Sequence, residues 1–140
     1  MSTKTTSDRK DPVIETRDQL IAAIAKGEKP KDRWRIGTEH EKFVYNRSDH
    51  HAPSYDEPGG IRDLLMAMTE FGWEPVYENG NVIAMSGSDG AISLEPAGQL
   101  ELSGAPLENL HQTCAETGRH LKQVKAIGDN IDTSIQELLK

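Results

Sequence analysis

The sequence has little cysteine and no long apolar run. Cys114 is the single cysteine among 140 residues, so an intramolecular disulfide is excluded and a reducing compartment is favoured. No apolar run approaches the length of a membrane span. The N-terminus has no apolar signal core. It also contains acidic residues, whereas transit peptides contain few. We therefore expect a protein of the cytoplasm.

Aromatic residues are also scarce, and basic residues are outnumbered by acidic ones, 16 to 23. The chain has two Phe, two Trp and three Tyr, which predicts an aliphatic core. Its net charge of −7 argues against a nucleic-acid partner, because such partners require a basic surface. The length suits one domain. Residues 1–12 are polar and without periodicity, so we expect a disordered N-terminus there and a single domain over 13–140.

The order of elements indicates an α+β fold with an antiparallel sheet. Thr16 and Gln19 form a capping-box pattern at the start of the first helix. Asn79-Gly80, between two apolar runs, is a strong hairpin signal. We expect helices at 16–26, 60–71 and 106–127. A strand is expected at 33–45, followed by a meander of four short strands at 73–77, 82–85, 91–95 and 99–103.

Side chains in the last two strands alternate with a period of two. Leucines and isoleucines occupy one face, and polar or acidic residues occupy the other. We expect an inner face formed by Ile83, Ile92, Leu94, Leu100 and Leu102. The helices at 60–71 and 106–127 should cover this face, because they carry the aliphatic surface that is needed.

Carboxylates repeat on the opposite face. Glu39 and Glu41 share a face of the first strand, and Glu95 and Glu101 flank the Pro96-Ala97-Gly98 turn. Glutamate is a poor strand former, so its repeated use suggests a role for the carboxylates. Clustered carboxylates repel one another unless a cation lies between them, and their hard oxygen atoms suit Mg²⁺. The alternative is an ordinary solvated sheet face.

Four further features have structural alternatives. Gln99 lies on the glutamate side and would either contact a substrate or cap the turn before it. His40 lies on the other face of its strand, where a packed histidine is expected rather than a ligand. Cys114 falls on the apolar stripe of the last helix, which predicts a buried, inert thiol. The loop Asp49-His50-His51 would either bind a transition metal or simply be exposed, and the exposed loop is expected because adjacent histidines in a polar loop are usually solvated.

Three stretches of this sequence resemble the N-terminal part of plant and proteobacterial glutamate–cysteine ligases. They are Gly37-Thr38-Glu39-His40-Glu41-Lys42-Phe43, the run from Ile92 to Glu108, and Leu110-His111-Gln112-Thr113-Cys114-Ala115-Glu116. The resemblance covers roughly residues 15–127. It departs at Val44, at Ala97, where the family usually has a second glycine, and at Leu100, where it usually has phenylalanine.

The resemblance implies an ATP-dependent ligase with a partly glutamine-synthetase-like sheet. Such enzymes join the γ-carboxylate of L-glutamate to L-cysteine and so make γ-glutamylcysteine, the first step of glutathione biosynthesis. It implies that Glu39, Glu41, Glu95 and Glu101 hold Mg²⁺ around ATP and glutamate. No residue is implied as a general base. His111, Gln112 and Glu116 match the family without an assigned role.

Two alternatives remain open at the level of sequence. In the first, the chain is a non-catalytic fragment of a ligase. Family members are several hundred residues long, so this chain would need the remainder of the ligase chain for catalysis. No Lys or Arg lies between Gln99 and Leu110, and no Gly-rich phosphate loop is present. Alternatively, the enzyme would join glutamate to another amine.

Overall fold

The computed structural model describes residues 13–88, 90–131 and 133–137. The chain divides into two compact units, residues 1–34 and 35–140. This division falls inside the single domain expected over 13–140, whose extent stays a prediction, and the expected disorder of 1–12 lies outside the described residues. Among the described residues, no helix is long and apolar enough to cross a membrane.

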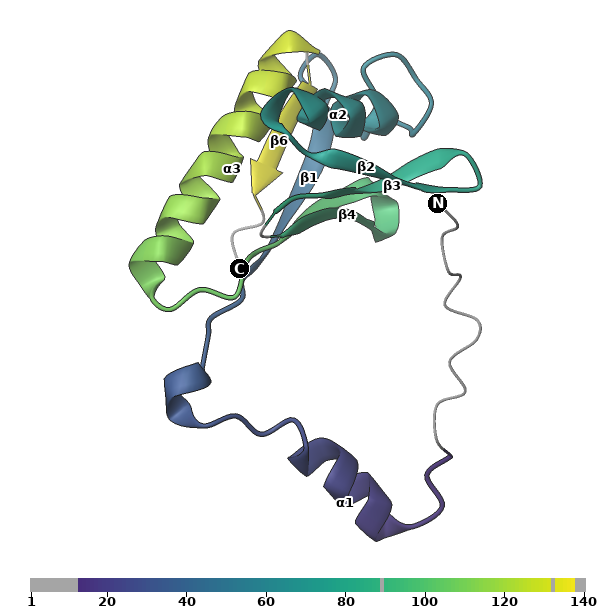
Figure 1. The fold of residues 1–140 in the computed structure, drawn as a ribbon. Coiled ribbons are helices and arrows are strands. Elements are labelled where there is room, and N and C mark those ends of the chain that lie inside the picture. Colours follow the sequence, from purple (N-terminus) through teal and green to yellow (C-terminus); the bar gives the residue numbers. More distant parts are fainter. Residues whose placement is uncertain (1–12, 89, 132, 138–140) are drawn as a thin grey trace. The chain divides into compact units, whose positions relative to one another are not determined.

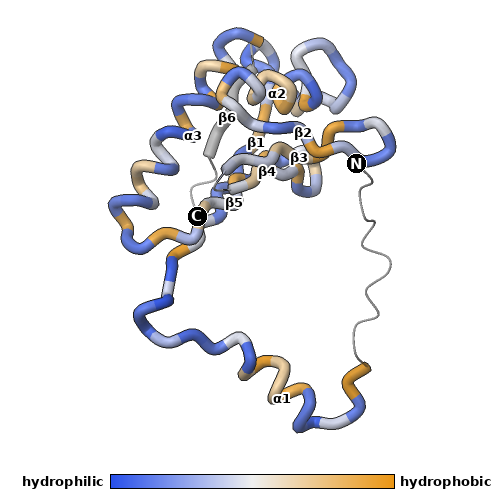
Figure 2. Tube along the Cα trace, viewed as in Figure 1, coloured by the Kyte–Doolittle hydropathy of each residue, from blue (hydrophilic) through white to orange (hydrophobic). Residues whose placement is uncertain are grey.

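The first unit contains helix α1 (Arg17–Ala25) and the short 3-10 helix η2 (Lys31–Arg33). Thr16 caps α1, and its hydroxyl accepts a hydrogen bond from the Gln19 backbone at 3.2 Å. The Gln19 side chain in turn accepts from the Thr16 backbone, so the predicted capping box is confirmed. The apolar residues of α1 (Leu20, Ile21 and Ile24) are exposed. Figure 2 shows hydrophobic and hydrophilic colours alternating along this helix.

The second unit is built on a six-stranded antiparallel sheet, which confirms the α+β prediction. The strand order is β2-β3-β4-β5-β1-β6. The strands are β1 (Glu39–Asn46), β2 (Glu74–Glu78), β3 (Asn81–Ser86), β4 (Ala91–Glu95), β5 (Gln99–Ser103) and β6 (Thr133–Glu137). The helices are α2 (Ile61–Ala67), continued by the 3-10 helix η3 (Met68–Phe71), and α3 (Leu110–Asn130); the 3-10 turn η4 (Pro96–Gly98) joins β4 to β5.

Helices α2 and α3 pack on one face of this sheet (Figure 1). The core cluster joins residues of both helices to the inner residues of the strands: Ile61, Leu64, Leu65, Met68, Val124 and Ile127 with Val44, Val82, Met85, Ile92, Leu100 and Leu102. Leu94 is partly buried against it. The predicted leucine face and its covering helices are confirmed. We call it the covered face.

The prediction for Ile83 is wrong. Its side chain is 38% exposed, whereas Val82 and Met85 on the same strand are buried. The pairing of β2 with β3 shifts here, because Val76 pairs with Ala84 but Tyr77 pairs with Val82. One extra residue in β3 reverses the alternation, so Val82 takes the inward position. The expected hairpin itself is confirmed, with Asn79 and Gly80 at φ 49° and 84°.

Helix α3 begins four residues later than expected. Leu107 forms an isolated bridge with Ile36, and Asn109 caps the helix by accepting a hydrogen bond from the Gln112 backbone. The predicted apolar stripe is consequently wrong in its first half: Leu110 is 67% exposed and Cys114 is exposed. The buried residues of α3 are Thr113, His120, Val124, Ile127 and Gly128.

Two differences concern the strands next to α3. Strand β1 begins at Glu39 rather than at residue 33. Strand β6 was not expected, and it pairs with β1 from Asn46↔Thr133 to Lys42↔Glu137. Strand β1 is therefore an interior strand, with β5 on one side and β6 on the other.

Candidate functional site

The four glutamates lie on one face of the sheet, opposite the covered face. The register places Glu41 directly across from Glu101, and Glu39 across from Ser103. On the other side of β5, Glu95 pairs with Gln99 and Ser93 pairs with Glu101. Because faces alternate along each strand, these side chains all point away from Leu100 and Leu102. We call this the glutamate face.

Glu101 lies at the centre of the glutamate face. Glu41 and Ser93 flank it on the neighbouring strands, and directly opposed residues have Cβ atoms roughly 4.5–5.5 Å apart. Glu101 is only 9% exposed, and its Oε1 accepts a hydrogen bond from the Ser103 hydroxyl at 2.9 Å. Within the described part of the chain, none of the four glutamates forms an ion pair with Lys, Arg or His.

This donor set suits a divalent cation with oxygen ligands. Two facing carboxylates without a cationic partner repel each other, and Mg²⁺ is usually held by one or two carboxylates together with waters and substrate phosphates. The described residues contain no group of three or more His, Cys, Asp or Glu side chains close enough to enclose a metal. The arrangement therefore fits a cation shared with substrate rather than one enclosed by protein.

Gln99 is engaged with the turn that precedes it. Its side-chain nitrogen donates to the Pro96 carbonyl oxygen at 3.2 Å, which is the structural alternative considered for this residue. Ala97 in the same turn has φ 63° and ψ 20°, in the left-handed region. This conformation explains why a glycine suits the position. A contact between Gln99 and substrate stays a prediction.

A row of polar side chains lies on the covered face, directly behind the glutamates of β1. His40 Nε2 and the Thr117 hydroxyl are 2.8 Å apart, so His40 is packed and hydrogen-bonded as expected. Lys42 is fully buried and donates from Nζ to the His40 carbonyl oxygen at 3.0 Å. This lysine was not among the residues predicted from the sequence, although the alternation that turns Glu41 outward turns Lys42 inward.

His120 of α3 completes this polar row. Its side chain is 2% exposed, and neither ring nitrogen has a hydrogen-bond partner among the described residues. Burial, followed by the charge of Lys42 and the proximity of His40, lowers the pKa of His120 to about 3. The imidazole is therefore neutral near pH 7.

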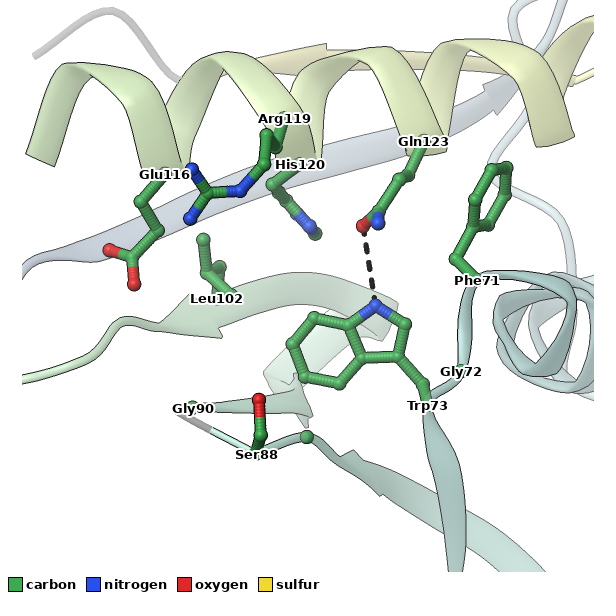
Figure 3. Close-up of a pocket in the computed structure, with 11 residues that line it drawn as sticks. Phe71, Gly72, Trp73, Ser88, Gly90, Leu102, Glu116, Arg119, His120 and Gln123 are labelled. Atoms are coloured by element: carbon green, nitrogen blue, oxygen red, sulfur yellow. Dashed lines mark hydrogen bonds between the residues drawn. The ribbon is translucent and has the colours of Figure 1, made fainter. Parts of the chain in front are cut away.

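A cavity of about 200 Å³ lies on the covered face (Figure 3). Helix α3 contributes Glu116, Arg119, His120 and Gln123, and Trp73 forms the opposite wall. The Trp73 indole nitrogen donates to Gln123 Oε1 at 3.2 Å. None of the predicted site residues lines this cavity. The sheet separates it from the glutamate face.

The loop histidines are exposed, as expected. His51 lies 3.8 Å from Asp49 and 3.7 Å from Glu57, measured between ring nitrogens and carboxylate oxygens. Cys114 is a free, exposed cysteine, so the prediction of a buried thiol is wrong. The physical reason is that α3 turns its apolar stripe toward the sheet only after His120.

Comparison with known proteins gives a consistent result. The model of the glutamate-cysteine ligase family 2 matches residues 35–135. Over 117 residues, the chain is 50% identical to glutamate–cysteine ligase A, chloroplastic, of Oryza sativa subsp. japonica, covering 83% of this chain and 23% of the relative. It is also 50% identical over 117 residues to the chloroplastic glutamate–cysteine ligases of Brassica juncea and Arabidopsis thaliana, with 83% of this chain and 22% of each relative covered.

The chain thus spans less than a quarter of the length of these relatives. Their names also contradict the expected cytoplasmic location, because each is described as chloroplastic. A single cysteine and the composition of the first residues were insufficient grounds for assigning a compartment. The match over residues 35–135 establishes the family: this chain belongs to the glutamate-cysteine ligase family 2.

Proposed function

We propose that this chain forms the N-terminal part of an ATP-dependent ligase that joins L-glutamate to L-cysteine, in the first step of glutathione biosynthesis. The family and the names of the relatives support the reaction. The observation that carries the role of this chain is the glutamate face. Glu41 and Glu101 oppose each other there without a cationic partner among the described residues.

In the proposed reaction, the γ-carboxylate of glutamate attacks the γ-phosphorus of ATP and forms an acyl phosphate with release of ADP. The cysteine amine then attacks the acyl carbon, and phosphate leaves. Glu41 and Glu101 would hold Mg²⁺, with Glu39 and Glu95 beside them on the same face. When bound, Mg²⁺ supplies positive charge to the phosphate oxygens during transfer.

The chain's own contribution is the rigid placement of carboxylates. The sheet is backed by a closely packed core, so Glu41 and Glu101 stay in register while substrates enter and leave. A carboxylate bound to Mg²⁺ has low proton affinity, so none of these glutamates is proposed as a general base. Gln99 would orient substrate from the adjoining turn.

Substrate anions also require cationic partners, which this chain supplies poorly. No Lys or Arg lies between Gln99 and Leu110. We therefore propose that the remainder of the ligase provides the basic residues, and that this chain alone has no turnover. Nothing on the glutamate face selects the amine, so a ligase with a different acceptor is the second candidate. Assaying the intact ligase with cysteine and other amines would distinguish the two.

The decisive variant is Glu101→Gln in the intact ligase. It keeps size and hydrogen bonding but removes the anionic oxygen that magnesium prefers. Turnover should fall by orders of magnitude, and excess Mg²⁺ should partly restore it, because a weakened site fills by mass action. The matched control is Glu70→Gln, which changes an exposed glutamate of η3. Superimposable curves of rate against Mg²⁺ for Glu101→Gln and the unchanged ligase would remove Glu101 from the site.

A further inference from the structure

Glu116 connects α3 to the chain just beyond β5. Its Oε1 accepts a hydrogen bond from the Ala105 backbone nitrogen at 2.8 Å. Ala105 is only 6% exposed, so loss of this acceptor would leave a largely buried backbone N–H without its partner. Figure 3 shows Glu116 projecting from α3 on the side of the sheet that the helix covers. The contact ties the helix to the end of the strand that carries Glu101.

The same carboxyl group lies against Gly104. A Cβ atom built on Gly104 would come within 2.3 Å of Glu116 Oε2 and 3.1 Å of the Thr38 carbonyl oxygen. The Gly104 backbone nitrogen donates to that Thr38 oxygen at 2.8 Å. Only a residue without a side chain lets α3 approach this closely. Glu116 therefore contacts the chain directly after β5, where the hydrogen bond between Gly104 and Thr38 joins it to the residue before β1.

These strand ends adjoin the glutamate face. Thr38 precedes Glu39, and Gly104 follows Ser103, which is the register partner of Glu39. Ser103 also donates from its hydroxyl to Glu101 Oε1 at 2.9 Å. A continuous path of contacts thus runs from Glu116 through the backbone at Gly104 and Ser103 to Glu101.

We propose that Glu116 is a positioning residue for cation binding on the glutamate face. From the covered side of the sheet, it fixes the ends of β1 and β5, so that Glu101 and Ser103 keep the geometry in which the carboxylate of Glu101 faces that of Glu41. The inference rests on the proposed function, because it assigns Glu116 to the same cation. It gives a role to a residue that sequence comparison left without one.

The test measures Mg²⁺ binding to the 140-residue chain by the chemical shifts of backbone amides, independently of activity. Glu116→Ala should weaken Mg²⁺ binding by roughly tenfold or more, the usual cost of losing a residue that orients a ligand. Glu116→Asp should weaken it similarly, because its carboxylate is one methylene too short to reach Ala105. Glu116→Gln should bind within about twofold of the unchanged chain, since its amide oxygen still accepts from Ala105. The hydrogen exchange rate of the Ala105 amide should rise only in the first two variants.

Glu101→Gln and Glu70→Ala serve as the two references. If Glu101→Gln leaves Mg²⁺ binding unchanged, the proposed cation role fails and the role of Glu116 fails with it. If Glu101→Gln weakens binding while Glu116→Ala and Glu116→Asp both bind like Glu70→Ala, the positioning role alone is overturned. Should Glu116→Ala fail to fold by circular dichroism, Glu116→Asp against Glu116→Gln decides the same question.

Discussion

The glutamate face and the covered face are formed by the same strands, but one carries opposed carboxylates and the other carries packed apolar side chains. On the covered face, Ile92, Leu100 and Leu102 are at most 2% exposed and pack against α2 and α3. On the glutamate face, Glu41 and Glu101 oppose each other with no cationic partner among the described residues. Consecutive residues of one strand therefore have different roles. Side chains that stabilise the fold point inward, and side chains that weaken it but suit a cation point outward.

A second contrast lies within the covered face. The C-terminal half of α3 packs through Val124 and Ile127, whereas its N-terminal half packs through Thr113, Thr117 and His120. The polar half lies against His40 and Lys42, immediately behind the glutamates of β1. The apolar half should provide stability, and the polar half should make that stability depend on pH.

The largest expected effect on stability tests the covered face. Leu102→Ala should lower the free energy of unfolding by about 2–5 kcal/mol, because it leaves a cavity at a residue that is 2% exposed. Ile83→Ala is the matched control: the bulge leaves Ile83 38% exposed, so the loss should stay below about 1 kcal/mol. Chemical denaturation measures both. Equal losses of stability would show that Ile83 is as buried as Leu102, which would contradict the bulge.

The polar half of α3 predicts a pH dependence. The pKa of His120 in the folded chain, about 3, lies below its ordinary value of 6.5, so unfolding takes up a proton at acidic pH. This contribution to stability is complete above about pH 6.5 and is lost as the pH falls toward 3. At pH 5 the loss should be on the order of 2 kcal/mol.

The variant that isolates this effect is His120→Leu. Denaturation at pH 7.5 and at pH 5 should show a smaller difference for His120→Leu than for the unchanged chain, because the variant has no imidazole to protonate. In the unchanged chain, the NMR signal of the His120 ring should not titrate down to about pH 4. A His120 titration near pH 6.5 would contradict the buried, neutral imidazole.

A smaller effect is expected when a charge is removed from the glutamate face of the isolated chain. Like charges directly opposite each other in a sheet destabilise it by roughly 0.2–1 kcal/mol. Glu101→Gln should therefore preserve or slightly raise the free energy of unfolding without Mg²⁺ at low salt. The gain should shrink at high salt, which screens the repulsion. A clear loss of stability at low salt would show that Glu101 supports the fold rather than opposing it.

The smallest effect concerns Cys114. Because its side chain is exposed, Cys114→Ser should change the free energy of unfolding by less than about 0.5 kcal/mol. A thiol reagent should label the native chain at this residue without denaturant. If labelling requires unfolding, the thiol is buried, as first expected from the sequence.

Sequence periodicity predicted much of the fold because it reports which side of a strand is buried. The faces of Leu100, Leu102 and Glu101 follow from alternation alone. The outward position of Ile83 does not follow from alternation, because a bulge depends on how two strands pair. No residue type in β3 predicts this bulge. Strand β6 and the late start of α3 likewise depend on contacts with β1 and with Ile36 that lie far away in the chain.

The candidate site was predicted as a set of residues but not as an arrangement. The sequence placed Glu95 and Glu101 together because they flank one turn. The register keeps both on the glutamate face, and it also places Glu41 directly opposite Glu101, while Glu95 faces Gln99. Glu116 left no signal of its role in the sequence, because its partners are the backbone groups of Gly104 and Ala105. Hydrogen bonds to backbone groups cannot be predicted from the pattern of side-chain types.

The left-handed conformation of Ala97 has a consequence for how readily this turn can change. An L-residue in that region costs about 1–2 kcal/mol, which glycine would avoid. Glycine would also add freedom to the unfolded chain, a loss of about 0.4–1 kcal/mol. The first term exceeds the second, so Ala97→Gly should raise the free energy of unfolding, by up to about 1.5 kcal/mol. In this turn, between two candidate cation ligands, alanine therefore gives a stiffer chain at some cost in stability, whereas glycine would give a looser and more stable one.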